Sequence, residues 1–179
     1  MLLLIDRIIK KITLVYRKAV FRRKIKCPHK SFFLVGNVHL INTNIKLGKN
    51  VTIYPDVMFW GDGPIVIGDN VDIGTNTIIY SSKQSGGITI GNNSIIAAQC
   101  YIIDMDHGTA KDIPIVKQSN SAAPITIGED VWLGANVTVL KGSNIANGAV
   151  IGAKALVKNN IPENAIAVGI PARAIKYRE

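Results

Sequence analysis

The chain has 179 residues, of which 47% are hydrophobic and only 6% aromatic, so it is long enough for one ordinary domain and too apolar for an intrinsically disordered protein. Its two cysteines, Cys27 and Cys100, cannot form the framework of a disulfide-rich secreted domain and are not spaced as a Cys-x-x-Cys motif. We therefore expect one principal domain with a small-aliphatic core, in the reducing cytoplasm.

The net charge of +9 is concentrated at the start of the chain. Residues 1–26 carry +8 of it, which leaves +1 for all the remaining residues. A nearly neutral body argues against a basic nucleic-acid groove on the main domain. We expect a separate basic segment at the N-terminus and no nucleic-acid partner.

Residues 2–22 are predicted to form an amphipathic helix. One face carries Ile5, Ile8, Ile9, Ile12, Val15, Tyr16 and Val20, and the other carries Arg7, Lys10, Lys11, Arg17 and Lys18. The two adjacent lysines interrupt the apolar run before the roughly 20 residues that a membrane span needs, and the first residues lack the basic start of a signal peptide. Two interpretations stay open: a helix on the cytoplasmic face of an anionic inner membrane, or a helix packed on the domain or on a neighbouring subunit.

After residue 30, aliphatic residues recur at every sixth position. They are Val35, Ile41, Leu47, Ile53 and Phe59, then Ile67, Ile73 and Ile79, then Ile90, Ile96 and Ile102, and finally Ile127, Leu133, Val139, Ile145, Ile151 and Val157. A period of six fits neither an α-helix nor a long alternating strand, but it fits a short strand followed by a turn. The pattern predicts parallel strands wound into a coil, with these residues inside.

The repeats are interrupted after every third hexad. The interruptions follow Phe59, Ile79 and Ile102, and they add two, five and nineteen residues to the step of six. This regularity predicts a three-sided prism in which every insertion leaves the same corner. The longest insertion, the loop 103–126, is the natural place for chemistry, because loops on a rigid scaffold often carry it.

Two segments of the repeat region, 124–142 (PITIGEDVWLGANVTVLKG) and 161–176 (IPENAIAVGIPARAIK), resemble the hexapeptide-repeat acyltransferases. Within that family they are most similar to the maltose and galactoside O-acetyltransferases and to O-acetyltransferases of bacterial surface polysaccharides. The resemblance covers about residues 31–179. It implies an all-β fold, a left-handed parallel β-helix behind the N-terminal α-helix, with a homotrimer as the assembly and acetyl-CoA as the co-substrate.

The expected organisation has three parts. Residues 1–30 form the basic amphipathic helix and a linker, residues 31–169 form the hexapeptide-repeat β-helix with its catalytic loop, and residues 170–179 form a C-terminal segment near coenzyme A.

The long loop begins Ile103-Asp-Met-Asp-His-Gly, which resembles the loop that holds the catalytic histidine of the family. His107 is therefore the candidate general base, since a neutral imidazole that titrates near pH 7 can remove the proton of an attacking hydroxyl. Asp104 and Asp106 are candidates to orient this imidazole or to stabilise its protonated form. The alternative for both aspartates is a solvated acidic loop.

Two further residues are candidates for the acceptor site. By resemblance, Asn76 contacts the acceptor or the oxyanion, although asparagine is also common in β-helix turns. Trp132 precedes an inward position and is expected to point outward. By resemblance it lines the cleft beside the acceptor and the thioester arm, and a subunit contact is the alternative.

The resemblance also implies the coenzyme A contacts. Ala135 and Ala153 would offer backbone groups to the pantetheine arm, and Lys158, Asn159, Arg173 and Lys176 would surround the nucleotide end. The family often has Thr-Lys-Asp where this chain has Lys158-Asn159-Asn160, so the phosphate that this lysine meets stays open. Lys158 and Lys176 can also be interpreted as ordinary solvated charges.

These features favour transfer of acetyl from acetyl-CoA to a hydroxyl of a sugar acceptor, in a bacterial surface polysaccharide or its precursor, without a covalent acyl-enzyme. Cys100 lies on a regular hexad and is interpreted as a filler of the core. The alternatives are an N-acetyltransferase for an amino-sugar nucleotide and a non-catalytic β-helix scaffold. A zinc enzyme on the same prism needs three imidazoles, and His29, His39 and His107 are too scattered along the repeats, so no metal is expected.

Overall fold

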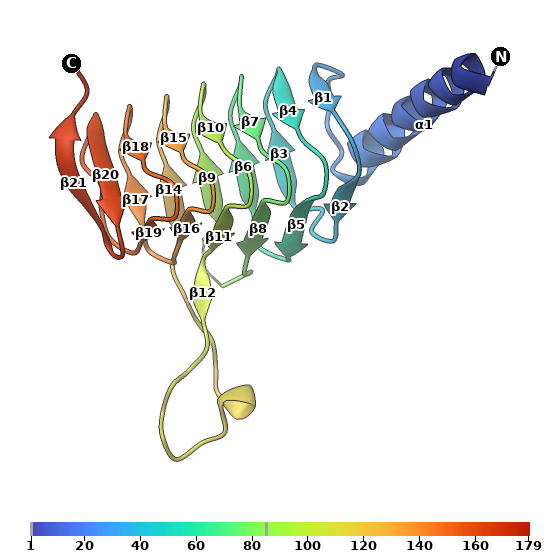
Figure 1. Ribbon diagram of the computed structural model, residues 1–179. Helices are drawn as coiled ribbons and strands as arrows, with labels where there is room; N and C mark the ends of the chain where they lie inside the picture. Colours follow the sequence, from blue (N-terminus) through green and yellow to red (C-terminus); the bar gives the residue numbers. More distant parts are fainter. Residues whose placement is uncertain (1, 85) are drawn as a thin grey trace.

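A computed structural model describes residues 2–84 and 86–179 of the chain. Inside the N-terminal helix its description omits the side chains of Leu2, Leu3, Leu4, Asp6, Ile8 and Lys10. Over the described residues, helix α1 (Leu2–Lys24) is followed by a left-handed parallel β-helix of about seven coils, as the repeat pattern and the resemblance predicted. The coils run from α1 at one end to the C-terminus at the other (Figure 1).

The β-helix has three flat faces, which we call A, B and C. Face A contains β1 (Phe32–Leu34), β4 (Val51–Ile53), β7 (Asp72–Ile73), β10 (Ile95–Ile96), β15 (Trp132–Leu133), β18 (Val150–Ile151), β20 (Ala165–Gly169) and the antiparallel β21 (Ala172–Tyr177). Face B contains β2 (Val38–Leu40), β5 (Val57–Gly61), β8 (Ile78–Ser81), β11 (Tyr101–Ile103), β16 (Thr138–Val139) and β19 (Leu156–Val157). Face C contains β3 (Ile45–Leu47), β6 (Ile65–Ile67), β9 (Ile88–Ile90), β14 (Ile125–Ile127) and β17 (Asn144–Ile145).

The core consists of columns of aliphatic side chains that run the length of the prism. Because the strands are parallel and in register, equivalent side chains of successive coils lie directly over one another, about 4.8 Å apart. On face C, for example, Ile67, Ile90 and Ile127 pair in register and are all buried. The period of six is therefore confirmed as one short strand and one corner per hexad.

The expected inward positions are wrong in the first coil. Val35 and Ile41 are 53% and 57% exposed, whereas Leu34 and Leu40, one residue earlier, point toward the core. The regular step resumes at Leu47, so the chain contains one extra residue between β2 and β3.

A buried asparagine explains this extra residue. The side-chain oxygen of Asn42 accepts the backbone N–H of Asn44 at 2.7 Å, and its amide donates to the carbonyl of Gly63 at 2.8 Å. Asn42 thus fills the corner and satisfies polar groups there, which a hydrophobic repeat pattern does not reveal.

The corners are turned by residues in the left-handed backbone region. Between faces C and A, Asn50, Asn70 and Asn93 have φ angles of 55°, 57° and 59°. Asparagine tolerates this conformation better than most residues. Their amides also form a ladder, with bonds of 3.2 Å from Asn50 to Asn70 and 2.9 Å from Asn70 to Asn93.

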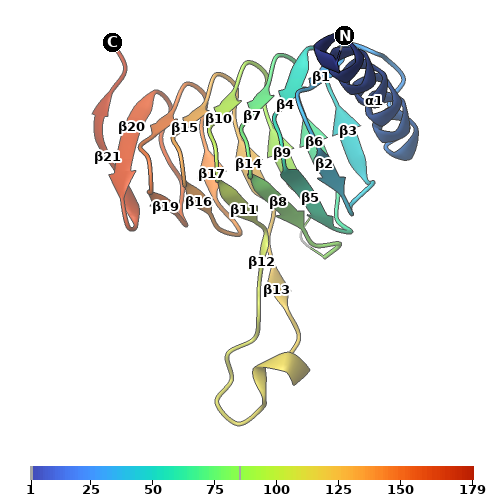
Figure 2. The same ribbon diagram turned by 45° about the vertical axis from the view of Figure 1, so that its right-hand side comes forward.

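All three insertions leave the corner between faces B and C, as their spacing predicted. They follow β5, β8 and β11, and the chain returns each time to face C. The longest forms an arm in which β12 (Met105–Asp106) pairs antiparallel with β13 (Ser121–Ala122), with the 3-10 turn η1 (Ile115–Lys117) beyond them. Figures 1 and 2 show this arm projecting from the middle of the prism.

Helix α1 extends the predicted 2–22 segment to Lys24, and among its described side chains those near its C-terminal end contact the prism. Phe21 and Ile25 are buried, and the ring of Phe21 lies 5.6 Å from that of Phe32 in the first coil. Of the residues predicted for the two helix faces, Ile8 and Lys10 lie outside the described side chains. No helix among the described residues has an apolar stretch long enough to cross a bilayer.

Replacement of Ile90 by alanine should lower the free energy of unfolding by about 2–5 kcal/mol, because it opens a cavity inside a continuous column. Thr89→Ala, at the exposed neighbouring position, should change it by about 0.5 kcal/mol or less. Urea unfolding of both variants measures the difference. Equal losses would contradict the assignment of the columns to the core.

Candidate active site

The base of the arm is fixed by a buried carboxylate. Asp104 follows β11 and is fully buried, and its carboxylate accepts the hydroxyl of Ser81 at 2.8 Å and the backbone N–H of Ser82 at 2.7 Å. Its own carbonyl accepts the N–H of Ala123 at 3.0 Å, where the chain returns from the arm. Since a buried carboxylate needs such partners, Asp104 ties both strands of the arm to the preceding insertion.

A second tie comes from the next coil. The ammonium of Lys141 lies 3.2 Å from a carboxylate oxygen of Asp106 and also donates to the hydroxyl and the carbonyl of Ser121. Asp106 and Ser121 face each other across the β12–β13 pair. Lys141 therefore holds the two strands of the arm together where they leave the prism.

The outer part of the arm is closed by one glutamine. Gln118 accepts the backbone N–H of Ala110 at 2.8 Å and donates to the carbonyls of Ala110 at 2.9 Å and Ile113 at 2.6 Å. These bonds join the two sides of the loop beyond β12 and β13. The arm thus has a defined shape out to its tip.

His107 follows β12 directly and is exposed. Its ring makes no hydrogen bond to another residue in the described part of the chain, and the two neighbouring aspartates bond elsewhere. Within the described residues of a single chain, neither Asp104 nor Asp106 is hydrogen-bonded to the imidazole. Both instead fix the arm that carries it, a role that sequence analysis missed.

The sequence did contain a sign of the Asp104 contact. Ser81 and Asp104 each stand two residues after the inward hexad position of face B, at Ile79 and Ile102. Equivalent positions of successive coils are neighbours in a prism. No comparable sign pointed to Lys141 or Gln118.

Asn76, Ala135 and Ala153 lie on one ridge, the corner between faces A and B. Asn76 has a φ angle of 59°, and Gln99 and Asn136 occupy equivalent turns with φ angles of 62° and 58°. The turn alone accounts for an asparagine at this position. The ridge and the arm leave opposite sides of face B, so one chain does not bring Asn76 and His107 to the same corner.

Trp132 points outward from face A and is exposed, as predicted. It stands in register with Ile95 and Val150 on the neighbouring strands. The side chains of Asn93, Asp130 and Arg178 border a shallow groove of about 240 Å³ beside it. Face A thus carries an apolar strip that its own chain leaves uncovered.

The four residues expected at the nucleotide end are all exposed in the last part of the prism. Lys158 and Asn159 follow β19 at the corner between faces B and C, whereas Arg173 and Lys176 lie on β21 along face A. The guanidinium of Arg173 donates to the carbonyl of Ala172 at 3.2 Å. The two pairs therefore occupy different sides of the prism and do not form one cluster.

Cys100 is buried at the corner between faces A and B, directly before β11. Its sulfur lies 3.3 Å from the carbonyl oxygen of Gly134, and burial raises the pKa of the thiol to about 11. A thiol with this pKa stays protonated at neutral pH and is a poor nucleophile. The interpretation of Cys100 as a core residue agrees with this environment.

Two of the three histidines, His29 and His39, have contacts of their own. His29 lies 2.9 Å from the carbonyl of Leu47, and His39 lies 3.2 Å from a carboxylate oxygen of Asp56. Among the residues with described side chains, no group of three or more His, Cys, Asp or Glu is placed to hold a metal ion.

Comparison with known proteins agrees with this architecture. Residues 124–159 match the family model of the bacterial transferase hexapeptide (six repeats), and residues 64–103 match that of the hexapeptide repeat of succinyl-transferase. The AntD N-acyltransferase of Bacillus cereus, solved with dTDP and coenzyme A, shares the fold with a TM-score of 0.71 at 21% identity, over 85% of this chain and 86% of that chain.

Two relatives in Escherichia coli are similar in sequence. The chain is 36% identical over 143 residues to a protein named as the lipopolysaccharide biosynthesis O-acetyl transferase WbbJ, covering 74% of this chain and 71% of that protein. It is 35% identical over 133 residues to one named as the colanic acid biosynthesis acetyltransferase WcaF, covering 74% and 69%. With its repeats, its prism and these relatives, the chain belongs to the bacterial hexapeptide-repeat transferases.

Proposed function

We propose that this protein transfers an acetyl group from acetyl-CoA to a hydroxyl of a sugar, in a bacterial surface polysaccharide or its precursor. The observation that carries the proposal is the anchored arm, which presents an exposed imidazole on a rigid frame. The names of the WbbJ and WcaF relatives support the acetyl group and the glycan acceptor. The AntD structure supports the coenzyme, since that protein holds coenzyme A on the same fold.

In the proposed reaction His107 accepts the proton of the sugar hydroxyl while its oxygen attacks the thioester carbonyl. The tetrahedral oxyanion is stabilised by hydrogen-bond donors, for which backbone N–H groups and Asn76 are the candidates. Collapse of this intermediate breaks the carbon–sulfur bond, and the departing thiolate takes the proton from the imidazolium. Transfer is direct, because the buried and protonated Cys100 is unsuited to form an acyl-enzyme.

The site is completed, we propose, by a neighbouring chain in a homotrimer. The arm and the ridge of Ala135 and Ala153 leave different corners of one prism. The tip of the arm also exposes Ile113, Ile115 and Val116, the last by 89%. Cyclic packing lets each arm cover an apolar surface of the next prism, such as the strip around Trp132, and brings His107 toward the ridge of that neighbour.

The coenzyme is proposed to lie along this ridge, with the nucleotide end among Lys158, Asn159, Arg173 and Lys176. The separation of these residues into two pairs fits two chains that each contribute one side. N-acylation of an amino-sugar nucleotide is the second candidate, because AntD, an N-acyltransferase that has been solved with dTDP-4-amino-4,6-dideoxyglucose, has the same fold.

We place the protein in the cytoplasm, in peripheral contact with the inner face of the membrane through residues 2–22. Both cysteines are free, which suits a reducing compartment. The basic N-terminal segment suits an anionic surface.

His107→Ala should lower kcat by about a hundredfold to ten-thousandfold, because it removes the general base. Cys100→Ala should retain activity, since its thiol stays protonated in the core. Release of free coenzyme A is to be measured with a panel of sugars, oligosaccharides and amino-sugar nucleotides. Loss of activity in the cysteine variant alone would refute direct transfer. Turnover with the amino-sugar nucleotides only would favour N-acylation. If the wild type shows neither turnover nor binding of coenzyme A, the protein is a scaffold.

Asp104→Ala should lower the free energy of unfolding by about 1–3 kcal/mol, because it removes the buried carboxylate that accepts hydrogen bonds from the Ser81 hydroxyl and the Ser82 backbone N–H. It should also lower kcat, because the arm loses its anchor. The matched control Asp106→Ala breaks only an exposed ion pair and should cost less than about 1 kcal/mol. If Asp104→Ala instead shifts the pH profile of kcat and leaves stability unchanged, the carboxylate acts on the imidazole and the anchoring role is wrong.

Val116→Asp should dissociate the trimer, because it places a charge at the apolar tip of the arm, whereas Val35→Asp, also at an exposed valine, should not. Light scattering after gel filtration gives the mass.

Co-expression of His107→Ala with Ala153→Trp tests the shared site further. Mixed trimers should regain activity, because the intact arm of an Ala153→Trp chain then meets the intact ridge of a His107→Ala chain. A mixture as inactive as either variant alone would contradict a site built from two chains.

A further inference from the structure

Helix α1 has two apolar surfaces on opposite sides. Phe21 and Ile25 form the buried surface that attaches the helix to the first coil. At 3.6 residues per turn, Ile5, Ile9, Ile12 and Tyr16 lie almost directly opposite them. We call these four residues the apolar stripe.

Over the described side chains, the apolar stripe is largely uncovered by its own chain, and only its last member, Tyr16, borders the pocket at the first coil. Ile5, Ile9, Ile12 and Tyr16 are 46%, 57%, 64% and 68% exposed. The half of α1 that carries them extends beyond the prism (Figure 1). Packing on the domain, one of the two interpretations of the sequence, therefore holds only for the last turns of the helix.

The other sides of the same helix are positively charged. Arg7, Lys11 and Arg17 are exposed, and residues 1–26 carry a net charge of +8. Lys18, by contrast, lies over the ring of Phe32 at 4.8 Å, and Arg22 donates to the carbonyl of Cys27 at 3.1 Å, so these two cations serve the attachment of the helix. The exposed cations are thus the ones left free to meet an external anion.

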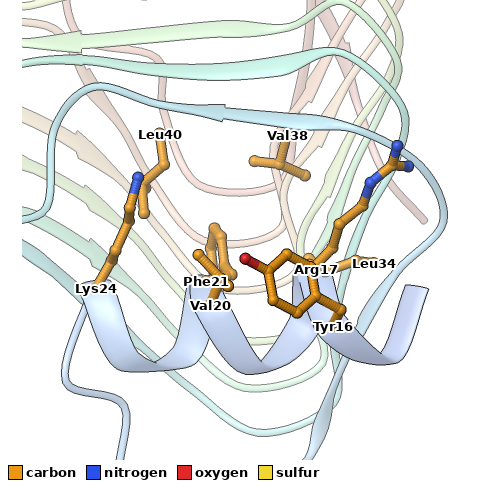
Figure 3. A pocket seen from close by; sticks show the side chains of 8 residues that line it. All are labelled: Tyr16, Arg17, Val20, Phe21, Lys24, Leu34, Val38 and Leu40. Carbon is orange, nitrogen blue, oxygen red and sulfur yellow. The ribbon is translucent and has the colours of Figure 1, made fainter. Parts of the chain in front are cut away.

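The junction between helix and prism repeats this combination of apolar and basic groups. A pocket of about 160 Å³ lies between α1 and the first coil, with Val20, Phe21 and Val38 among its apolar lining. Figure 3 shows Arg17 and Lys24 at its two ends. Lysine and arginine in such places keep their stems against apolar groups while their charges remain in water, where an anionic surface can attract them.

We propose that α1 docks the protein on an anionic lipid bilayer, with the apolar stripe in the headgroup region and the cations Arg7, Lys11 and Arg17 on the polar sides of the helix attracted to the anionic surface. This rests on the proposed placement at the membrane and assigns the contact residues and the lipid class. Charge favours this occupant over a second copy of the chain. Three helices of a trimer that packed stripe to stripe would bring three strongly positive segments together, whereas anionic lipid neutralises them.

Docking gives the prism a defined orientation. The first coil lies next to the bilayer, and the arm with His107 leaves the prism farther along its length. The tyrosine of the stripe suits the interface, since its ring is apolar and its hydroxyl remains in contact with water. The site is then held at a fixed distance from the lipid surface.

The test is co-sedimentation of the full chain with vesicles of phosphatidylcholine, alone or mixed with phosphatidylglycerol. The wild type should bind the mixed vesicles, release them as salt increases and bind phosphatidylcholine poorly. Ile9→Asp/Ile12→Asp should weaken binding by at least about tenfold. The matched control is Ile41→Asp, because Ile41 on the prism is 57% exposed, like Ile9, and it should bind as the wild type does.

A second variant keeps the stripe and removes charge. Arg7→Gln/Lys11→Gln should weaken binding to the mixed vesicles by about fivefold for each cation removed. Unchanged binding of either double variant would overturn the proposal. So would a stripe variant that changes the molecular mass in lipid-free solution and still binds vesicles, because the stripe would then be a subunit contact.

Vesicle binding is expected to be independent of catalysis. His107→Ala should bind vesicles as the wild type does while failing to release coenzyme A. If the wild type fails to bind the mixed vesicles but still transfers acetyl to a soluble acceptor, docking is disproved and the transferase proposal stands.

Discussion

The structure depends on one constraint, the stacking of each coil on the next through in-register parallel backbone hydrogen bonds. A side chain at a given hexad position meets the same position in the coils before and after it, as Ile67, Ile90 and Ile127 do. Such a column tolerates no extra residue within a strand, because a shift of one residue turns the side chains to the other surface. Extra residues are accommodated only at corners, and the chain places its insertions at the corner between faces B and C.

This constraint produces a site on a firm base. The arm emerges where two coils are already fixed, and polar groups of neighbouring coils hold it: Ser81 and Ser82 through Asp104, and Lys141 through Asp106 and Ser121. A general base on a long loop would otherwise lose much of its effect to motion. The ridge with Asn76 and Ala153 lies on the other side of face B. The separation of the two halves is the structural reason to infer that neighbouring chains share the site.

A stack of coils must also end, and both ends of the prism are covered. An uncovered terminal coil exposes core side chains to solvent. At the beginning, Phe21 of α1 packs against Phe32 and Phe59 and covers the first coil. At the other end, β21 pairs antiparallel with β20 and closes face A. The last turns of helix α1 thus pack on the fold, and its N-terminal half is available to contact another partner.

The sequence by itself determined the repeated part of the molecule. A period of six with interruptions at every third hexad specifies a three-sided prism with one corner for insertions, and His107 stood out because it lies within the longest of them. Tertiary structure decided the register of the first coil, where the buried Asn42 shifts the pattern by one residue, and the partners of Asp104, Asp106 and Lys141. The physical reason is that the repeat is visible in residues close together in the sequence. The partner of a buried polar group, by contrast, is a residue of a neighbouring coil, far away in the sequence, that the fold brings within hydrogen-bonding distance.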